Sequence, residues 1–412
     1  MFERTYYDTS PTTRTISYNI HRYSSFRFIT MPYLNPAEKA TKLRMCAPLA
    51  QEYMRLYPDS GSTLGDILFS QLPHNLIWLF AVPVDGHEYT FSFHKEPSSS
   101  SGPRPIQSHG SPAKLLCLPF EIHTLILDQL QDNREKGQLQ YRRDRDCMRL
   151  GLTNKYFLTL VLPYLHKRWV SRMGPWAGKN VVFVGWPGYD PPQLLSEDEA
   201  LPLGREMAIH CEKGCPISPS LCSFFLHDHK GRTEIYLKQT DDCLACALHG
   251  VDFKNPSAIL LKYWTDIMQF ERMDFYPQGQ QWILRNLTTK EFVRSEAIAL
   301  DPTFIHGPDI DGIGFGHVIL SRICWSTDPL GRIENPTNIM RGVWAGHRFD
   351  ITHLSRHREI TKGEKWADVS NEVVNEIARI WEGEFGPGWR EHVIERRSEK
   401  PPEQWDYYFK YE

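Results

Sequence analysis

The sequence predicts an α+β protein in which a small helical module precedes a larger mixed α+β domain rich in aromatic residues. The segment 117–130, CLPFEIHTLILDQL, has the apolar spacing of a helix. The chain beyond Trp169 holds ten of the twelve tryptophans, among short apolar runs separated by glycine and proline. Such runs are typical of the strands of a mixed sheet. At 412 residues, 41% of them hydrophobic, the chain is long enough for two or three packed units.

The N-terminal segment, residues 1–96, is expected to hold a helix and a β-hairpin. Asn35 followed by Pro36 has the pattern of a helix cap with proline in the first turn, which predicts a helix over 37–57. Farther along, the apolar runs NLIWLFAVPV and EYTFSFH flank an Asp-Gly pair, and the second run alternates aromatic with polar residues. This arrangement is typical of two strands joined by a tight turn.

A linker is predicted at residues 97–112, where Pro, Ser and Gly occupy 12 of 16 positions. Such a composition offers too little apolar surface to offset the entropy lost on ordering. The helical module then extends over residues 113–170.

The apolar residues at the start of this module fall on one face of the predicted helix. They recur at i, i+4, i+7, i+8 and i+12, in Leu118, Ile122, Leu125, Ile126 and Leu130. A second apolar series follows in 146–165, so we expect two or three short helices. These helices are too few to cover all the apolar side chains, and each large aliphatic side chain removed from water contributes about 1.5–3 kcal/mol. We therefore expect a partner polypeptide to cover the remainder.

The segments LPFEIHTLILDQL and CMRLGLTNKYFLTL resemble an F-box. They share its Leu-Pro-x-Glu-Ile opening, its leucine-rich first helix and an x-x-L-x-L-T-x-K-x-F second half. The resemblance implies a three-helix module that docks on the small adaptor subunit of cullin-type ubiquitin ligases. Carried over by position, the adaptor-binding residues are Leu118, Pro119, Glu121, Ile122, Ile126, Leu150 and Phe157, with Glu121 at the family's acidic position.

The two halves of this motif are separated by the sixteen residues 131–146, five basic and four acidic. We expect this segment to form a charged loop, since a long loop costs little additional entropy.

Residues 171–395 are expected to form the α+β domain, followed by a C-terminal tail at 396–412. Strands are predicted in VVFVGW, EIYLK, WILR, EFVR, HVILSRIC and RFDI, with WILRNLTTKEFVR as a hairpin, and the segment 366–383 has the 3.6-residue period of an amphipathic helix. Several segments of this region are similar to the C-terminal regions of F-box-like proteins abundant in filamentous fungi. That similarity implies a domain that binds a target but names no target.

Five of the nine cysteines lie between residues 211 and 246. Closely spaced thiolates are typical zinc ligands, which makes Cys211, Cys215, Cys243 and Cys246 an alternative zinc site. Unpaired, partly buried thiols are the favoured interpretation, because the spacing of the first pair is irregular.

Three further patterns have a competing structural interpretation. His353 and His357 could place two imidazoles on one helical face, although a solvated helix surface is favoured. GPWAGKN and GIGFGHV fail the spacing of phosphate-binding and dinucleotide-binding loops. We expect the glycines of the two Gly-x-Trp-Ala-Gly segments to supply turns beside inward-packing tryptophans.

The balance of charges argues against several classes of partner. The net charge is −3, from 47 basic and 50 acidic residues, so no global field attracts nucleic acid or a membrane surface. An export signal and an uninterrupted membrane-spanning run are both missing from the sequence. Nine cysteines without an export signal favour reduced thiols in the cytoplasm or nucleus.

The sequence therefore favours an F-box substrate receptor that binds the adaptor and cullin of a ubiquitin ligase and recruits an unknown protein target. No nucleophile signature is recognisable, so we expect neither catalytic residues nor cofactors. Two alternatives stay open: an enzyme or zinc-binding protein with its site in 171–395, and an F-box protein that works with the adaptor alone.

Overall fold

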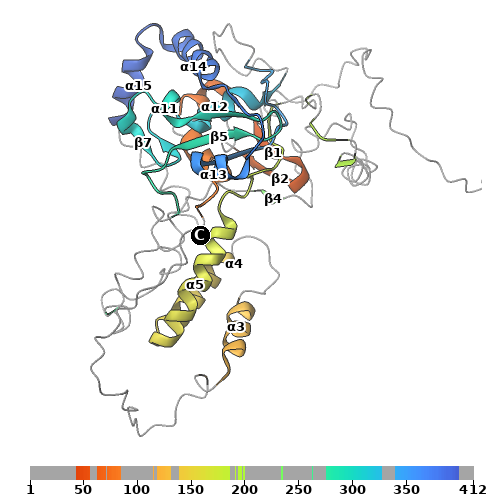
Figure 1. Ribbon diagram of the computed structural model, residues 1–412, viewed down its shortest axis with the longest axis vertical. Helices are drawn as coiled ribbons and strands as arrows, with labels where there is room; N and C mark the ends of the chain where they lie inside the picture. Colours follow the sequence, from red (N-terminus) through yellow and green to blue (C-terminus); the bar gives the residue numbers. More distant parts are fainter. Residues whose placement is uncertain are drawn as a thin grey trace, which may run out of the picture. The chain divides into compact units, whose positions relative to one another are not determined.

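The computed structural model describes residues 43–55, 63–70, 72–84, 115, 118–130, 139–185, 191, 194–196, 198–199, 233–234, 262, 275–326 and 339–398. The predicted linker at 97–112, the four cysteines of the alternative zinc site and most of the C-terminal tail lie outside these ranges. The described residues have an α+β fold, in which helices accompany several small mixed sheets (Figure 1). Among them, no helix has the length and apolar character needed to cross a membrane.

The first sheet has five strands in the order β4-β2-β1-β3-β9. Their bounds are β1 Arg44–Ala47, β2 Glu52–Arg55, β3 Val182–Val184, β4 Thr233–Glu234 and β9 Cys324–Trp325. Strand β1 is antiparallel to both β2 and β3, whereas the outer strands β4 and β9 are parallel to their neighbours. Strand β1 is buried along its whole length because it lies at the centre of this sheet.

The second sheet has four strands in the order β10-β5-β6-β11. Their bounds are β5 Trp282–Asn286, β6 Glu291–Arg294, β10 Phe349–His353 and β11 Ala367–Asp368. Strand β5 is antiparallel to β6 and β10, and β11 is parallel to β6. A separate pair joins β7 (Ile305–His306) to β8 (Asp309–Ile310).

The helices of the α+β domain come from both ends of the chain. They are α1 Leu64–Leu68, α2 Leu72–Phe80, α11 Ser295–Ile298, α12 Phe315–Ile323, α13 Leu354–Ile360, α14 Ser370–Phe385 and α15 Trp389–Ser398, with 3-10 turns at η2 Pro48–Ala50 and η5 Pro302–Phe304. Helices α2 and α12 pack against each other, and every residue of α12 is buried. Residues 43–84 thus belong to the same α+β domain as the C-terminal part of the chain, beyond the expected boundary at 171.

The α+β domain contains two halves in which a set of corresponding elements follows in the same order. Each half begins with an antiparallel hairpin, β1–β2 or β5–β6. The residue before the second strand of each hairpin has left-handed torsions, with φ 53° at Gln51 and 56° at Lys290. The two hairpins share a sequence pattern, QEYMR at 51–55 and KEFVR at 290–294. A buried helix follows in each half, α2 in the first and α12 in the second.

Each half ends in a Gly-x-Trp-Ala-Gly loop, at 174–178 or 342–346, followed by β3 or β10. The indole N–H of Trp176 donates to the carboxylate of Glu52 at 2.8 Å. In the second half, Trp344 donates to Glu291 at 2.9 Å. Both tryptophans are buried, as expected from the sequence, and each ties its loop to the hairpin of its own half.

The two loops exchange the same hydrogen bond. The N–H of Gly178 donates to the carbonyl of Phe349 at 2.7 Å, and the N–H of Gly346 donates to the carbonyl of Val181 at 2.8 Å. Reciprocal contacts of this kind are characteristic of two-fold symmetry. Both glycines have positive φ, 76° at Gly178 and 82° at Gly346, so they supply the turn geometry expected of them. The two halves are therefore related by an approximate two-fold axis.

Three sequence-based expectations for the secondary structure of the α+β domain are wrong. The helix expected over 37–57 is replaced, where the chain is described, by β1, η2 and β2, because Pro48 starts a tight turn and β1 pairs on both sides. The run NLIWLF, expected as a strand, forms the second part of α2. HVILSRIC, also expected as a strand, forms most of α12 and the first residue of β9. Both helices are buried almost all round, and a short apolar run of this kind cannot be told from a buried strand by its periodicity alone.

Most other expectations for the second half are confirmed. WILR, EFVR and RFDI lie in β5, β6 and β10, and the predicted hairpin pairs Asn286 with Glu291 next to its turn. VVFV lies over β3. The helix expected at 366–383 is α14, which starts later, at Ser370, because Ala367 and Asp368 pair with β6 as β11. Of EIYLK, only Glu234 is described, at the end of β4.

The helical module consists of α3 Phe120–Gln129, α4 Leu139–Gly151 and α5 Lys155–Arg172 (Figure 1). Figure 1 shows α4 and α5 side by side, and the two helices pack against each other. The charged loop expected over 131–146 is wrong in its second part, because α4 begins at Leu139. Asp144, within this segment, is a buried carboxylate that binds side chains of α5.

Candidate docking surface

Helix α3 exposes the apolar face that the sequence predicts. Its N-terminal turn is preceded by Pro119, whose missing N–H costs nothing at that position. The exposed fractions are 39% for Leu118, 57% for Phe120, 38% for Ile122, 55% for Leu125 and 38% for Leu130. The buried residues of the helix are His123 and Leu127, one turn apart on the opposite face. The described residues therefore leave one side of α3 uncovered.

His123 holds α3 on α5. Its Nε2 donates to the carbonyl of Leu115 at 2.7 Å, and its Nδ1 accepts from the hydroxyl of Tyr156 at 2.8 Å. The ring also contacts Phe157 edge-on, with centroids 5.3 Å apart. Each ring nitrogen of this buried imidazole thus has a partner, which a buried polar group requires.

A second tie joins the other end of α3 to α5. The hydroxyl of Tyr164 donates to the carboxylate of Asp128 at 2.9 Å. Burial and this hydrogen bond raise the pKa of the Tyr164 hydroxyl, so it stays protonated as the donor. Two hydrogen-bonded contacts, about one and a half turns apart on α3, therefore set the orientation of the helix and of its exposed face.

The base of the module is a buried cluster of charges between α4 and α5. Arg172 forms a bidentate pair with Asp144, with N–O distances of 2.7 and 3.2 Å. The indole of Trp169 donates to the same carboxylate at 3.1 Å, and Arg168 lies 3.3 Å from it. Because the carboxylate is desolvated, these donors must replace its water shell. The cluster locks α4 against α5.

The residues assigned from the F-box resemblance fall into two groups. Leu118, Pro119, Glu121 and Ile122 are exposed on α3, with Ile126 half-buried at the margin of the same face. Leu150 on α4 is half-buried against the core, and Phe157 on α5 is buried beside His123. The first group lies together at the N-terminal end of α3, and Phe157 of the second group supports the helix from behind through His123.

Exposed apolar side chains concentrate on this module. Among the described residues, ten large hydrophobic side chains are exposed, and six of them lie on α3, its flanking residues or the first turn of α5. We call the exposed apolar residues that share one helical stripe the α3 face: Leu118, Ile122 and Leu125. Scattered single hydrophobics are ordinary on protein surfaces, whereas a contiguous set marks an interaction site.

The other sites weighed from the sequence do not assemble in the described residues. His353 caps the N-terminus of α13 by accepting from the N–H of Arg356, while His357 packs edge-on against Trp366 with centroids 4.9 Å apart. The two imidazoles therefore do not share a helical face, and α13 is the surface helix favoured from the sequence, with His357 as its buried residue. Across the described ranges, no group of three or more His, Cys, Asp or Glu side chains could hold a metal ion.

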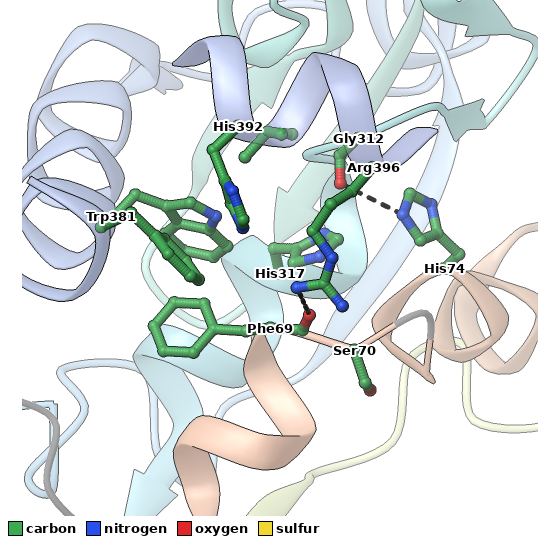
Figure 2. A pocket seen from close by; sticks show the side chains of 10 residues that line it. Phe69, Ser70, His74, Gly312, His317, Trp381, His392 and Arg396 are labelled. Carbon is green, nitrogen blue, oxygen red and sulfur yellow. Dashed lines mark hydrogen bonds between the residues drawn. The ribbon is translucent and has the colours of Figure 1, made fainter. Parts of the chain in front are cut away.

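One pocket of the α+β domain was not predicted from the sequence. It lies among α1, α2, α12, α14 and α15, and its cavity volume is about 40 Å³ (Figure 2). His74, His317, His392 and Arg396 supply its polar lining. His74 and His317 are the third residues of α2 and α12, so they occupy equivalent positions in the two halves. The related segments DILFSQLPH at 66–74 and DIDGIGFGH at 309–317 could have indicated this equivalence from the sequence.

Comparison with known proteins adds no further constraint, since no family model, no curated protein and no solved structure matches the chain.

Proposed function

We propose that the α3 face binds the adaptor subunit of a cullin-type ubiquitin ligase, and that the α+β domain recruits a protein target to it. The observation that carries the proposal is the exposure of Leu118, Ile122 and Leu125 on the face that resembles an F-box. A protein that folded α3 only for its own core would turn these side chains inward. Here the inward positions belong to His123 and Leu127.

The α3 face offers enough apolar surface to drive association. Each large aliphatic side chain fully removed from water contributes about 1.5–3 kcal/mol. The spacing of Leu118, Ile122 and Leu125 places them along one stripe of the helix, which suits insertion into an apolar groove of a partner. Glu121 lies exposed beside this stripe and is available to a basic group at the rim of the interface.

Phe157, in the second group of assigned residues, acts by holding α3 in place. Phe157 packs against His123, and the hydroxyl of Tyr156 binds the same imidazole. These contacts hold α3 before any partner arrives, which lowers the entropy lost on binding. The tyrosine is itself partly exposed next to α3, so it extends the surface that a partner covers.

The proposed activity needs no reacting residue in this chain. A receptor that holds a target beside a charged conjugating enzyme raises the effective concentration of the two reactants. The target would bind the α+β domain, and the adaptor would bind the α3 face. Separate surfaces allow both partners to be bound at once.

The test is binding of purified adaptor to the intact chain and to the double variant Ile122→Ala with Leu125→Ala. The two truncations remove apolar contacts worth about 3 kcal/mol or more together, so we expect at least a hundredfold loss of affinity. The matched control is Val343→Ala with Ile360→Ala, two exposed aliphatic side chains of the α+β domain. The control should bind like the intact chain.

Failure of the intact chain to bind the adaptor would refute the proposal, and so would equal losses in the two double variants. Far-UV dichroism of each variant shows whether its helices are retained. Recovery of a cullin together with the adaptor from cells distinguishes a ligase receptor from a protein that works with the adaptor alone.

A further inference from the structure

The pocket shown in Figure 2 lies where the two halves of the α+β domain meet. The rings of His74 and His317 lie 5.0 Å apart, edge to face. One wall is aromatic, because Phe69 contacts both Trp381 and Phe385 with ring centroids 5.1 and 5.0 Å apart. Such a wall accepts the apolar part of a ligand.

His317 presents a hydrogen-bond donor to this pocket. Its Nδ1 accepts from the backbone N–H of Gly314 at 3.1 Å, so the proton of the neutral ring is assigned to Nε2. Burial and the neighbouring His74 hold the pKa of His317 well below its usual value, so the ring is neutral at physiological pH. Within the described part of the chain, Nε2 of His317 has no hydrogen-bond partner.

A second ring nitrogen at the pocket lacks a partner, and the exposed side chain of Arg396 lies at the same pocket. His392 stacks on Phe385 with centroids 4.4 Å apart, and its Nε2 is buried without a hydrogen-bond partner among the described residues. Arg396 donates one N–H to the carbonyl of Phe69 at 3.3 Å. Its other donors bind nothing in the described ranges. A buried polar nitrogen without a partner is rare in folded proteins and calls for a physical reason.

The lining contains almost no acceptor for these groups. None of the ten lining residues carries a carboxylate. The carbonyl of Gly312 already accepts from Nε2 of His74 at 3.1 Å, and the other nitrogen of that ring faces Asp309 at 3.6 Å. A missing acceptor, an arginine and an aromatic wall together suit a ligand that brings its own negative oxygen atoms.

We propose that this pocket binds a carboxylate or phosphate group attached to a small apolar or aromatic body. The guanidinium of Arg396 would pair with the anionic oxygens, and the ring nitrogens of His317 and His392 would bind the same group. The cavity of about 40 Å³ has room for the anionic group alone, so the attached body would lie at the open mouth, beside Phe69. This site goes beyond adaptor binding and does not depend on it.

The experiment uses the full chain with ¹³C-labelled histidine rings, titrated with phenyl phosphate, phenylacetate and neutral benzyl alcohol. We expect saturable shifts of the His317 and His392 ring signals with at least one of the two anions and none with benzyl alcohol. The ratio of the two anion affinities tells a phosphate site from a carboxylate site. His392→Phe identifies one of the two signals and should weaken anion binding.

Arg396→Gln removes the charge with little change in shape, and we expect it to weaken anion binding about tenfold or more. Arg390→Gln is the matched control, because Arg390 lies on the same helix but stacks on Trp389, 4.6 Å from the ring centroid. The control should bind the anion as the intact chain does. The site is ruled out if neither anion gives a saturable shift, if benzyl alcohol gives the same shifts, or if Arg396→Gln binds like Arg390→Gln.

Discussion

Single buried charges in this protein are each held by several partners. Asp144 accepts hydrogen bonds from Arg172 and Trp169 while Arg168 lies nearby. In the α+β domain, Arg285 forms a buried bidentate pair with Asp350, at 2.7 and 2.6 Å. A desolvated charge is stable only with such compensation, so loss of one partner leaves the others unpaired in a low dielectric.

Asp144 therefore offers a sharp test at the residue scale. Asp144→Ala leaves two arginines facing an empty, partly desolvated site, and we expect it to destabilise the helical module by about 3–5 kcal/mol. Urea unfolding followed by far-UV dichroism measures this loss.

Asp146 is the matched control, two residues away on the same helix. It lies 3.5 Å from Arg149 and 3.7 Å from Arg145 in a more exposed position. Asp146→Ala should cost about 1 kcal/mol or less. Equal losses from the two substitutions would show that the buried cluster does not hold α4 against α5.

At the scale of elements, helices α2 and α12 cross at Gly316, where the backbones of the two helices approach closely. A methyl group built on Gly316 would overlap the backbone carbonyl of Pro73. Neither helix backbone can move without disturbing the loops that bind its end, since Trp176 donates its backbone N–H to Leu79 and Trp344 to Arg322. The crossing thus requires glycine for close approach.

We expect Gly316→Ala to destabilise the domain by about 1–3 kcal/mol, because overpacking a rigid contact forces backbone shifts. The control is Gly388→Ala, at a site where an added methyl group meets no atom within 4 Å. It should change the free energy of unfolding by about 0.5 kcal/mol or less. A Gly316→Ala protein with unaltered thermal stability would contradict the close packing of the two helices.

The two helices that cross here, α2 and α12, were also not predicted correctly from the sequence. Strands β5, β6 and β10 have alternating or β-branched sequences and hairpin turns, and these were predicted. Helices α2 and α12 were taken for strands because a short apolar run that is buried on most sides is compatible with either a strand or a helix. Strand β1 was taken for a helix because its pairing with β3 joins segments more than 100 positions apart.

The two candidate sites also differ in how far the sequence could predict them. The α3 face was predictable, since Leu118, Ile122 and Leu125 follow helical spacing within one segment. The anion pocket was not, because Arg396 and the histidines of α2 and α12 come together only through the packing of the two halves. Each of those residues alone has the pattern of an ordinary surface or core position.

At the scale of the whole molecule, the two halves explain the order of modules along the chain. The first loop glycine, Gly174, follows His74 after 100 positions, whereas Gly342 follows His317 after 25. The helical module occupies this additional length. It is therefore an insertion between two elements of the first half, and insertions at such connections add function to a scaffold at low cost in stability.

Acid should destabilise the α+β domain. Burial lowers the pKa of four histidines: His317, His347, His353 and His357. In the unfolded chain these rings take up protons as the pH falls through about 6.5, while in the folded chain they stay neutral to lower pH. Their contribution to stability is thus complete above about pH 6.5 and declines below it.

We expect the thermal midpoint to fall between pH 7.5 and pH 5.5, which a series of calorimetric scans measures. Carboxylates with lowered pKa, such as Asp368, act only at lower pH. Glu376, whose pKa is raised mainly by burial, opposes the trend slightly because its protonation favours the folded state. A midpoint that stays constant or rises over this range would contradict the neutral burial of the histidines.

Hydrogen exchange of the chain with and without saturating adaptor tests the proposed adaptor site on α3 most directly. The amides of α3 and of the first turn of α5 should exchange several-fold more slowly when the adaptor is bound, while those of β5 and β10 keep their rates. Unchanged exchange throughout α3, with slowing confined to the α+β domain, would contradict an adaptor site on that helix.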